Sequence, residues 1–384
     1  MTRRERLMAT LRGEPVDRPP VSFYEIGGLR MDPSDPDPYN IYNAPDWGPL
    51  VQLAEEHTDL IRLMSPVRDR SIDPTGSATS GRWHEFFREE THDNGEARVT
   101  HTILTIAGRT LTQTTKRESQ INTVWTVEPL LKDANDVEAY LAVPDDVFTE
   151  QIDIAPLVAE ESVLGEKGIV MVDTEDPLCA AASLMSMEDY TVLAFSAPSL
   201  FHQLLEKMAR RIQPRTAAVS RRFPGRLWRI YGPEYASEPY LPPRQFDEYV
   251  VRYVAPMIHE IHAHGGFARV HCHGRLRNIL DMIAGMGADG LDPIEPPPQG
   301  DMTLREVRQR HGKQLVLFGN LEAADIEMLP PSQFTEVVKR ALDEGTAGRG
   351  RGFVLQPSAC PYGRDLTPFT MPNYETMVRL VEAW

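Results

Sequence analysis

Short runs of apolar residues recur along the chain, and most of them lead into a segment whose apolar positions repeat at helical spacing. The apolar runs stand at residues 21–25, 59–63, 169–173, 227–231, 267–271, 290–292, 315–319 and 353–356. The clearest helical patterns occupy residues 243–264, 275–286, 303–311, 332–344 and 373–383. Eight strands that each lead into a helix are the number that closes a parallel barrel. The pattern therefore predicts one α/β domain over residues 1–384, folded as a single (β/α)8 TIM barrel.

Residues 81–130 depart from this alternation. The stretch "RVTHTILTIAGRTLTQTTKRE" has a period of two and is rich in threonine, and turn signals stand at Asn94-Gly95 and Gly108-Arg109. These features predict an antiparallel β insertion around residues 81–130. At the amino end, Thr2 and Glu5 have the spacing of a capping box and Gly13 follows as a stop, which predicts a first helix between them.

In a barrel of this kind, chemistry is expected where the strands end and the loops begin. The polar and aromatic residues at those places are Tyr24, Glu25, Asp173, Glu175, Tyr231, Glu234, Tyr235, His271, His273, Asp292, Glu295, Asn320, Glu322 and the stretch Gln356–Cys360. We expect Asp173, Glu295 and Asn320 to be candidates for orienting a substrate. Tyr24, Tyr231 and Tyr235 are candidates for lining an apolar pocket, although aromatic residues flank the strands of many barrels.

The stretch "RVHCHGRL" is the strongest candidate for a metal site. Residues two apart on an extended strand point the same way, so His271 and His273 share a side and Cys272 faces the other. Cys360 is a candidate third ligand and Glu234 a candidate fourth. Imidazole and thiolate ligands suit zinc and do not suit magnesium or calcium. The alternative is that both histidines are packing or surface residues, because this spacing is looser than that of a zinc finger.

Composition limits the partners that the chain can have. Its 40 Lys and Arg residues stand against 56 Asp and Glu residues, a net charge of −16, which argues against binding nucleic acid or an anionic membrane. The 3 cysteines form no disulfide framework, as in a reducing cytoplasm. Neither a signal peptide nor a run of roughly 20 apolar residues is found. The sequence predicts a soluble cytoplasmic protein.

Four segments resemble the uroporphyrinogen decarboxylase superfamily: "RRERLMATLRGEPVDRPPV", "HCHGRLRNILDMIAGMGADGLDPIEP", "LFGNLEAADI" and "NYETMVRLVEAW". The resemblance covers nearly the whole chain and implies a distorted (β/α)8 barrel. The true decarboxylases carry an arginine-rich amino-terminal segment that holds the propionates of a tetrapyrrole. Here the corresponding stretch, "VSFYEIGGLRMDPSDPDP", contains Arg30 alone. Since a polyanionic substrate needs compensating cations, we do not expect porphyrinogen decarboxylation.

The other branch of that superfamily contains zinc-dependent methyltransferases that work with corrinoid proteins. Their pattern is His-x-Cys-Gly at a strand end, with a second cysteine near the carboxyl terminus. The resemblance places His271 at the family histidine, His273 where the first cysteine usually stands, and Cys360 at the second. Glu234 lies in the region that supplies an additional acidic ligand. The resemblance thus implies Zn²⁺ and a corrinoid (cobalamin) cofactor carried by a partner protein, and the His-for-Cys change puts a thiol substrate in doubt.

The segments "FYEIGG", "YGPEYAS" and "IEPPPQGD" are most similar to members that demethylate methoxylated, often aromatic, compounds. The implied reaction moves a methyl group to a Co(I) corrinoid, with zinc as Lewis acid on the leaving oxygen. Tyr24, Glu25, Tyr231 and Tyr235 would then bind substrate, and Glu234 would be a metal ligand or an acid.

Two alternatives stay open: a cofactor-independent decarboxylase, with Arg30 or Arg62 facing a carboxylate, and a non-catalytic barrel that binds a ligand or a corrinoid partner. The methyl donor, the final acceptor and the oligomeric state stay open too, although many relatives form dimers.

Overall fold

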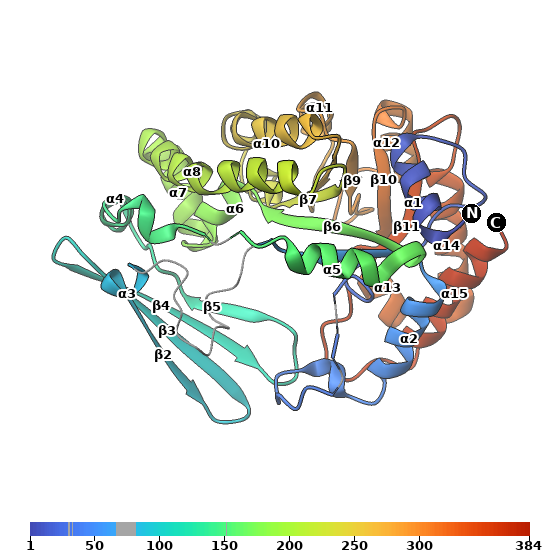
Figure 1. Cartoon of the computed structure of the whole chain (residues 1–384), viewed down its shortest axis with the longest axis horizontal. Helices are drawn as coiled ribbons and strands as arrows, with labels where there is room; N and C mark the ends of the chain where they lie inside the picture. Colours follow the sequence, from blue (N-terminus) through green and yellow to red (C-terminus); the bar gives the residue numbers. More distant parts are fainter. Residues whose placement is uncertain (30, 33, 67–81, 151) are drawn as a thin grey trace.

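The computed structural model describes residues 1–29, 31–32, 34–66, 82–150 and 152–384. Its centre is a curled parallel sheet of seven strands in the order β1-β6-β7-β8-β9-β10-β11 (Figure 1). The strands are β1 (Leu60–Met64), β6 (Gly168–Glu175), β7 (Leu227–Tyr231), β8 (Phe267–His271), β9 (Gly290–Asp292), β10 (Val316–Leu321) and β11 (Phe353–Pro357). The predicted α/β barrel class is confirmed.

The predicted strand at residues 21–25 is wrong, and a single bridging residue takes its place. Val21 pairs with Leu355 of β11 as an isolated bridge, and its carbonyl accepts a hydrogen bond from the Asp59 backbone N–H beside β1 at 2.7 Å. The segment therefore joins the two edges of the sheet. A full strand does not form because Pro19 and Pro20 have no N–H to donate, and the backbone turns at Tyr24, where φ is 57°.

Helices follow most strands and cover the outside of the sheet (Figure 1). The longer ones are α1 (Arg3–Arg12), α2 (Trp47–His57), α5 (Ala155–Leu164), α7 (Met187–Ser196), α8 (Pro198–Arg222), α10 (Arg252–Ala263), α14 (Pro331–Gly345) and α15 (Thr370–Glu382). The shorter ones are α3 (Trp83–Phe86), α4 (Ala134–Leu141), α6 (Pro177–Ala182), α9 (Pro243–Phe246), α11 (Leu280–Gly285), α12 (Leu304–His311) and α13 (Ala323–Met328). The helix predicted over residues 275–286 starts late, at Leu280, because residues 277–279 form turns.

Helix α1 closes the barrel at the end where the strands begin. Its capping box between Thr2 and Glu5 is present, and Gly13 ends it in the left-handed conformation at φ 72°. Leu7 and Leu11 of this helix pack into the barrel interior. The interior residues that they join are Ile61, Leu63, Ile169, Met171, Leu227, Val316, Phe318 and Val354. The amino ends of the strands are therefore filled by apolar side chains, which leaves the carboxyl ends for polar ones.

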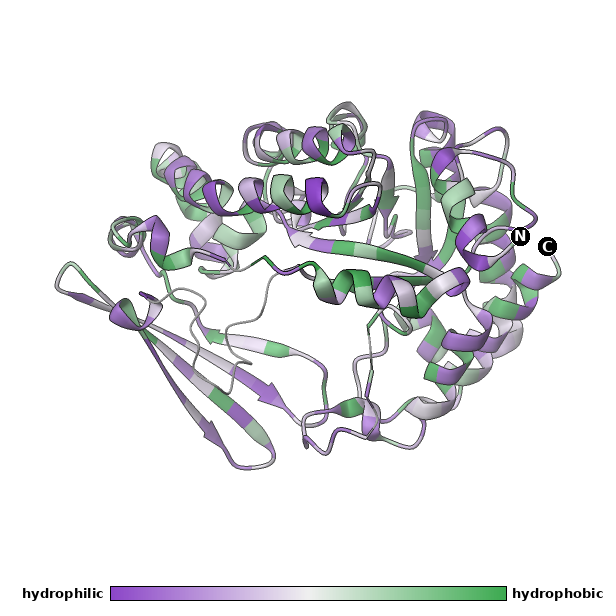
Figure 2. Ribbon diagram, in the orientation of Figure 1, coloured by the Kyte–Doolittle hydropathy of each residue, from purple (hydrophilic) through white to green (hydrophobic). Residues whose placement is uncertain are grey.

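The predicted insertion is confirmed as a separate antiparallel sheet in the order β2-β3-β4-β5. Its strands are β2 (Phe87–Asp93), β3 (Ala97–Ile106), β4 (Arg109–Glu118) and β5 (Val124–Glu128). Figure 2 shows hydrophobic colouring along most of β6 with a hydrophilic carboxyl end, and mostly hydrophilic or mixed colouring on this antiparallel sheet. Among the residues that the structure describes, no helix combines the length and the apolar character needed to cross a membrane.

Candidate active site

Strand alternation places a layer of polar side chains directly above the apolar filling of the barrel. In β10 and β11, Phe318 and Val354 belong to the interior cluster. Gln356 follows Val354 by two residues and so points the same way, and Asn320 is the partner of Gln356 in the strand register. His271 is likewise the register partner of Tyr231 on one side and of Asp292 on the other. Residues far apart in the sequence therefore meet at one end of the barrel.

Two ion pairs lie at the base of this polar layer, next to the apolar interior of the barrel. Arg269 is 1 % exposed and donates two hydrogen bonds to the carboxylate of Asp292, one of them from Nε at 2.5 Å. Arg229 holds Asp173 in the same way, at 2.6 and 3.0 Å, and also donates to the Tyr24 hydroxyl. Asp173, which the sequence suggested as a substrate-orienting acid, is thus engaged by an arginine. Neither arginine was singled out from the sequence.

Each of the two candidate histidine ligands is held by a carboxylate at its Nδ1 atom. His271 Nδ1 lies 2.7 Å from Asp292 Oδ2, and His273 Nδ1 lies 2.7 Å from Glu295 Oε1. The ring centroids are 4.7 Å apart and the rings are nearly perpendicular, at 87°. Within the described chain, neither Nε2 atom has a hydrogen-bond partner. A carboxylate on one ring nitrogen fixes the tautomer and leaves the other nitrogen free to bind a metal.

The charges of these groups favour the ionised forms of both acids. Burial opposes the ionisation of Asp292, but the charges of Arg269 and His271 hold the pKa of that carboxyl well below its usual range. For His273, burial lowers the pKa, but the hydrogen bond and charge of Glu295 outweigh it and raise the pKa above the ordinary value. The pKa of Glu295 is lowered, because His273 outweighs the opposing effect of burial. Both acids are therefore ionised acceptors.

Cys360 lies in the same region but contacts another acid. Its Sγ atom is 2.8 Å from Glu25 Oε2. The ring of Tyr24, the residue before Glu25, stacks on His271 with centroids 5.9 Å apart and planes inclined by 14°. Burial, and then the charge of Glu25, raise the pKa of the Cys360 thiol well above its usual range, so the thiol is protonated here. Glu25, a predicted substrate-binding residue, is the partner of this thiol.

Glu234 and the two tyrosines near it are placed by the loop after β7. Glu234 belongs to a single 3-10 turn (Pro233–Ala236), and its Oε2 accepts a hydrogen bond from Gly232 N at 3.1 Å. The guanidinium of Arg229 lies 5.1 Å from the ring centre of Tyr231. Tyr235 packs against Tyr190 of α7, whose hydroxyl donates to the Tyr235 carbonyl at 2.8 Å. In the part of the chain that the structure describes, no three His, Cys, Asp or Glu side chains lie close enough together to hold a metal ion.

A third acid, Glu322, stands just after β10. Its Oε2 accepts a 3.3 Å hydrogen bond from the Ser358 hydroxyl, and its Oε1 is buried with no partner among the described residues. Burial raises the pKa of Glu322 to about 7, and the charge of Glu295 adds to this effect. The alternation in "FVLQP" was the sequence signal that could have singled out Gln356, two residues after an interior valine.

Residues 120–384 match the family model described as uroporphyrinogen decarboxylase (URO-D). The chain belongs to the URO-D family. A structure described as a methyltransferase from Methanosarcina mazei is similar to this URO-D family protein, with a TM-score of 0.63 and 17% sequence identity over 100% of this chain and 99% of the other. At that identity the likeness shows a shared fold, including the segment before residue 120.

A second structure, D-psicose 3-epimerase from Clostridium cellulolyticum H10 with D-tagatose, has a TM-score of 0.33 and 11% identity over 59% of this chain and 80% of the other. A TM-score of 0.33 is too low to bear on the fold or the site. The search of curated proteins returned no match.

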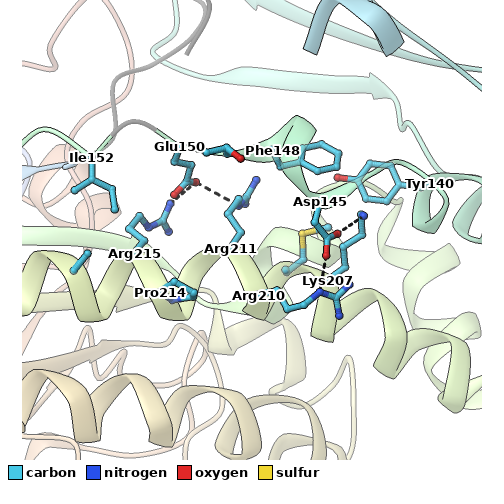
Figure 3. Close-up of a pocket in the computed structure, with 13 residues that line it drawn as sticks. Tyr140, Asp145, Phe148, Glu150, Ile152, Lys207, Arg210, Arg211, Pro214 and Arg215 are labelled. Atoms are coloured by element: carbon cyan, nitrogen blue, oxygen red, sulfur yellow. Dashed lines mark hydrogen bonds and ion pairs between the residues drawn. The ribbon is translucent and has the colours of Figure 1, made fainter. Parts of the chain in front are cut away.

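The URO-D family protein also has a cavity of about 390 Å³ away from the histidines (Figure 3). Its charged lining residues are Lys207, Arg210, Arg211, Arg215, Asp145 and Glu150. These charges pair with one another: Asp145 lies 2.7 Å from both Lys207 and Arg210, and Glu150 lies 2.8 Å from Arg215. Arg211 and Arg215 also hold Glu175, at 3.1 and 2.8 Å. Glu175 is therefore drawn toward α8, and the cavity contains none of the candidate ligands.

Arg30 and Arg62 are the two arginines that a decarboxylase was expected to use to face a substrate carboxylate. Arg62 is buried and pairs with Glu160 at 2.9 Å and Glu55 at 2.7 Å. It therefore already has its carboxylate partners. Arg30 lies outside the described residues.

Proposed function

We propose that this URO-D family protein is a methyltransferase. It would move a methyl group from a methoxylated, for example aromatic, small molecule to the Co(I) corrinoid of a partner protein. The observation that carries the proposal is the pair His271 and His273, each with a carboxylate on Nδ1 and a free Nε2. The shared fold with a structure described as a methyltransferase supports it.

His271, His273 and Cys360 would hold the zinc ion, and Glu234 would be a fourth ligand or an acid beside it. The donor set fits zinc, because two neutral imidazoles and a sulfur are ligands that it prefers. Cys360 would turn from Glu25, and Glu234 from Gly232, to take part. When bound, zinc supplies a Lewis acid that stabilises negative charge on the leaving oxygen.

The chain's own residues prepare this donor set. Asp292 and Glu295 keep a proton on the Nδ1 atoms, so that each Nε2 presents a lone pair. Arg269 fixes Asp292 through two hydrogen bonds and so orients His271 indirectly. Glu25 Oε2 accepts the hydrogen bond of the Cys360 thiol and would take its proton, which must leave if the sulfur is to bind a cation.

The remaining predicted residues have positioning roles in this proposal. Asp173 holds Arg229, and Arg229 in turn donates to the hydroxyl of Tyr24, whose ring stacks on His271. Tyr24 and Tyr231 would offer aromatic surface to an apolar part of the substrate. Asn320 would face the substrate from β10, beside its register partner Gln356.

Elemental analysis of the purified protein tests the proposal. We expect about one zinc ion per chain, as in a mononuclear site, and its loss in His271→Ala, His273→Ala and Cys360→Ala. Cys272→Ala is the matched control, because Cys272 is buried next to both histidines but faces away, and this variant should retain the metal. Zinc that survives all three ligand substitutions would refute the proposal.

The reaction itself is tested by methyl transfer to a Co(I) corrinoid protein, which is monitored through the absorbance of the cobalt centre. A protein that binds zinc and methoxylated compounds without methylating cobalt would instead be a binding barrel. Release of carbon dioxide from a carboxylic acid, without zinc, would favour the decarboxylase.

A further inference from the structure

Gln356 is a buried amide without hydrogen-bond partners. Its side chain is 1 % exposed. Neither its Oε1 nor its Nε2 has a partner among the residues that the structure describes. Buried polar groups in folded proteins are nearly always paired, because an unpaired one loses its bonds to water without replacement. The amide therefore needs a partner that is not part of the described chain.

The position of Gln356 shows where that partner would lie. Val354, two residues earlier in β11, packs in the barrel interior, so Gln356 points to the same axis one layer higher. By the register of the strands, His271 and Asp292 are level with Phe318 and Val354, so Gln356 lies two residues farther toward the carboxyl ends of the strands. The amide thus faces the candidate active site and not the surrounding helices.

A second unpartnered group lies just after the adjoining strand. Glu322, two residues after the register partner of Gln356, has a buried Oε1 without a partner among the described residues. Its other oxygen contacts Ser358, two residues after Gln356. Two independent side chains, one on β11 and one just after β10, thus present unused polar atoms at the carboxyl ends of neighbouring strands.

We propose that Gln356 determines substrate specificity by hydrogen-bonding a second polar group of the methylated compound, one that both donates and accepts, such as a hydroxyl or a carboxamide. An amide offers one acceptor and one N–H₂ donor, so a group of this kind satisfies both ends at once. Glu322 Oε1 provides a further oxygen for the same group. The inference rests on the proposed function, because it names the class of that substrate.

The inference excludes methyl ethers that carry no second polar group. A site built to hydrogen-bond a substrate hydroxyl rejects the analogue that lacks it, because the site's own polar groups then stay unpaired. A methoxyphenol or a methoxybenzamide would be accepted, and methoxybenzene would be rejected.

Binding calorimetry separates these cases without turnover. The probes are the three isomers of methoxyphenol and of methoxybenzamide, with methoxybenzene as the reference. We expect at least one isomer to bind about tenfold tighter than methoxybenzene or better, the difference that one good hydrogen bond makes. In Gln356→Leu the ratio between the affinity for that isomer and the affinity for methoxybenzene should fall toward one, while the affinity for methoxybenzene itself stays the same.

Gln245→Leu is the matched control. Gln245 lies on α9, outside the barrel interior, and it too is a buried glutamine with an unpartnered oxygen. Its substitution should leave the ratio unchanged. Unfolding by urea in the absence of ligand should show Gln356→Leu to be at least as stable as the wild type, because an unpaired polar group is removed.

Equal binding of all seven compounds, no binding of any, or a preference that survives in Gln356→Leu would each overturn the inference. The elemental analysis for zinc is independent of this binding calorimetry. Discrimination by Gln356 in a protein that binds no zinc would leave the recognition standing and remove the methyl-transfer chemistry, and zinc without discrimination would do the reverse.

Discussion

Glu322 is a carboxylic acid whose surroundings disfavour its charged form. Burial is the largest cause that raises the pKa of Glu322, and the charge of Glu295 is the next. The hydrogen bond from Ser358 and the charge of His273 lower that pKa. Asp325 adds a smaller repulsion. With a pKa near 7, this side chain changes its charge in the physiological range, where an unperturbed glutamate does not.

The free energy of unfolding should therefore depend on pH in part through the titration of Glu322. Its pKa rises from 4.5 to about 7 on folding, so the folded state binds the proton more tightly. This stabilisation is fully present below 4.5 and is lost as the pH rises through about 7. We expect Glu322→Gln to gain stability relative to the wild type over that interval, in urea unfolding with a chelator present.

Glu336→Gln is the control for that series, because Glu336 is exposed and its carboxylate pairs with Lys339 at 2.8 Å on the same helix. Its difference from the wild type should stay nearly flat with pH. A flat difference for Glu322→Gln would show that this acid is ionised at neutral pH.

At the scale of elements, strands β8 and β9 are joined by a buried ion pair. Arg269 and Asp292 are each almost fully buried, and the Arg269 guanidinium lies 4.6 Å from the ring centre of Phe318 on β10. Three neighbouring strands therefore meet around one arginine. Removing one member of such a pair leaves a buried charge without its partner, which costs far more than the pair contributes.

We expect Arg269→Met to lower the free energy of unfolding by about 3–5 kcal/mol, measured in urea. Arg269→Met combined with Asp292→Leu should cost less than the sum of the single changes, because neither charge is left behind. The exposed pair Arg310–Asp281 supplies the comparison, since Arg310→Met should cost no more than about 1 kcal/mol. Additive costs at Arg269 and Asp292 would contradict this account.

At the scale of the whole molecule, one residue ties the antiparallel sheet to the barrel. Arg364 follows Cys360 in the loop after β11 and donates to the Ser119 carbonyl at 2.9 Å, just beyond β4. It also donates to Asn43 Oδ1 at 2.6 Å. Its own carbonyl accepts a hydrogen bond from Trp47 Nε1 at 3.1 Å. Two segments distant in sequence, one at Ser119 and one at residues 43–47, therefore converge on this residue.

We expect Arg364→Ala to speed amide hydrogen exchange at residues 119–122 and 38–43 while the barrel strands keep their protection, because only the local ties are lost. Arg88→Ala is the control, since Arg88 lies on the exposed strand β2 and pairs with Glu90 two residues away. Unchanged exchange in these two segments would show that other contacts hold the sheet.

The sequence predicted the barrel because the short apolar runs recur regularly and most lead into a helical pattern, and the segment at residues 21–25 was misjudged because the prolines before it limit pairing. The convergence of His271 and His273 followed from their spacing alone. The sequence did not predict the contacts that hold them, because the Asp292 and Glu295 partnerships depend on which strands are neighbours. Nor did it separate Asp173, which Arg229 engages, from Gln356, which has no hydrogen-bond partner among the described residues, since both depend on packing.

The side chains of Leu7 and Leu11 fill the barrel at the end where its strands begin. A ligand of the polar layer is therefore not expected to enter past these two leucines, and a spent ligand is not expected to leave that way.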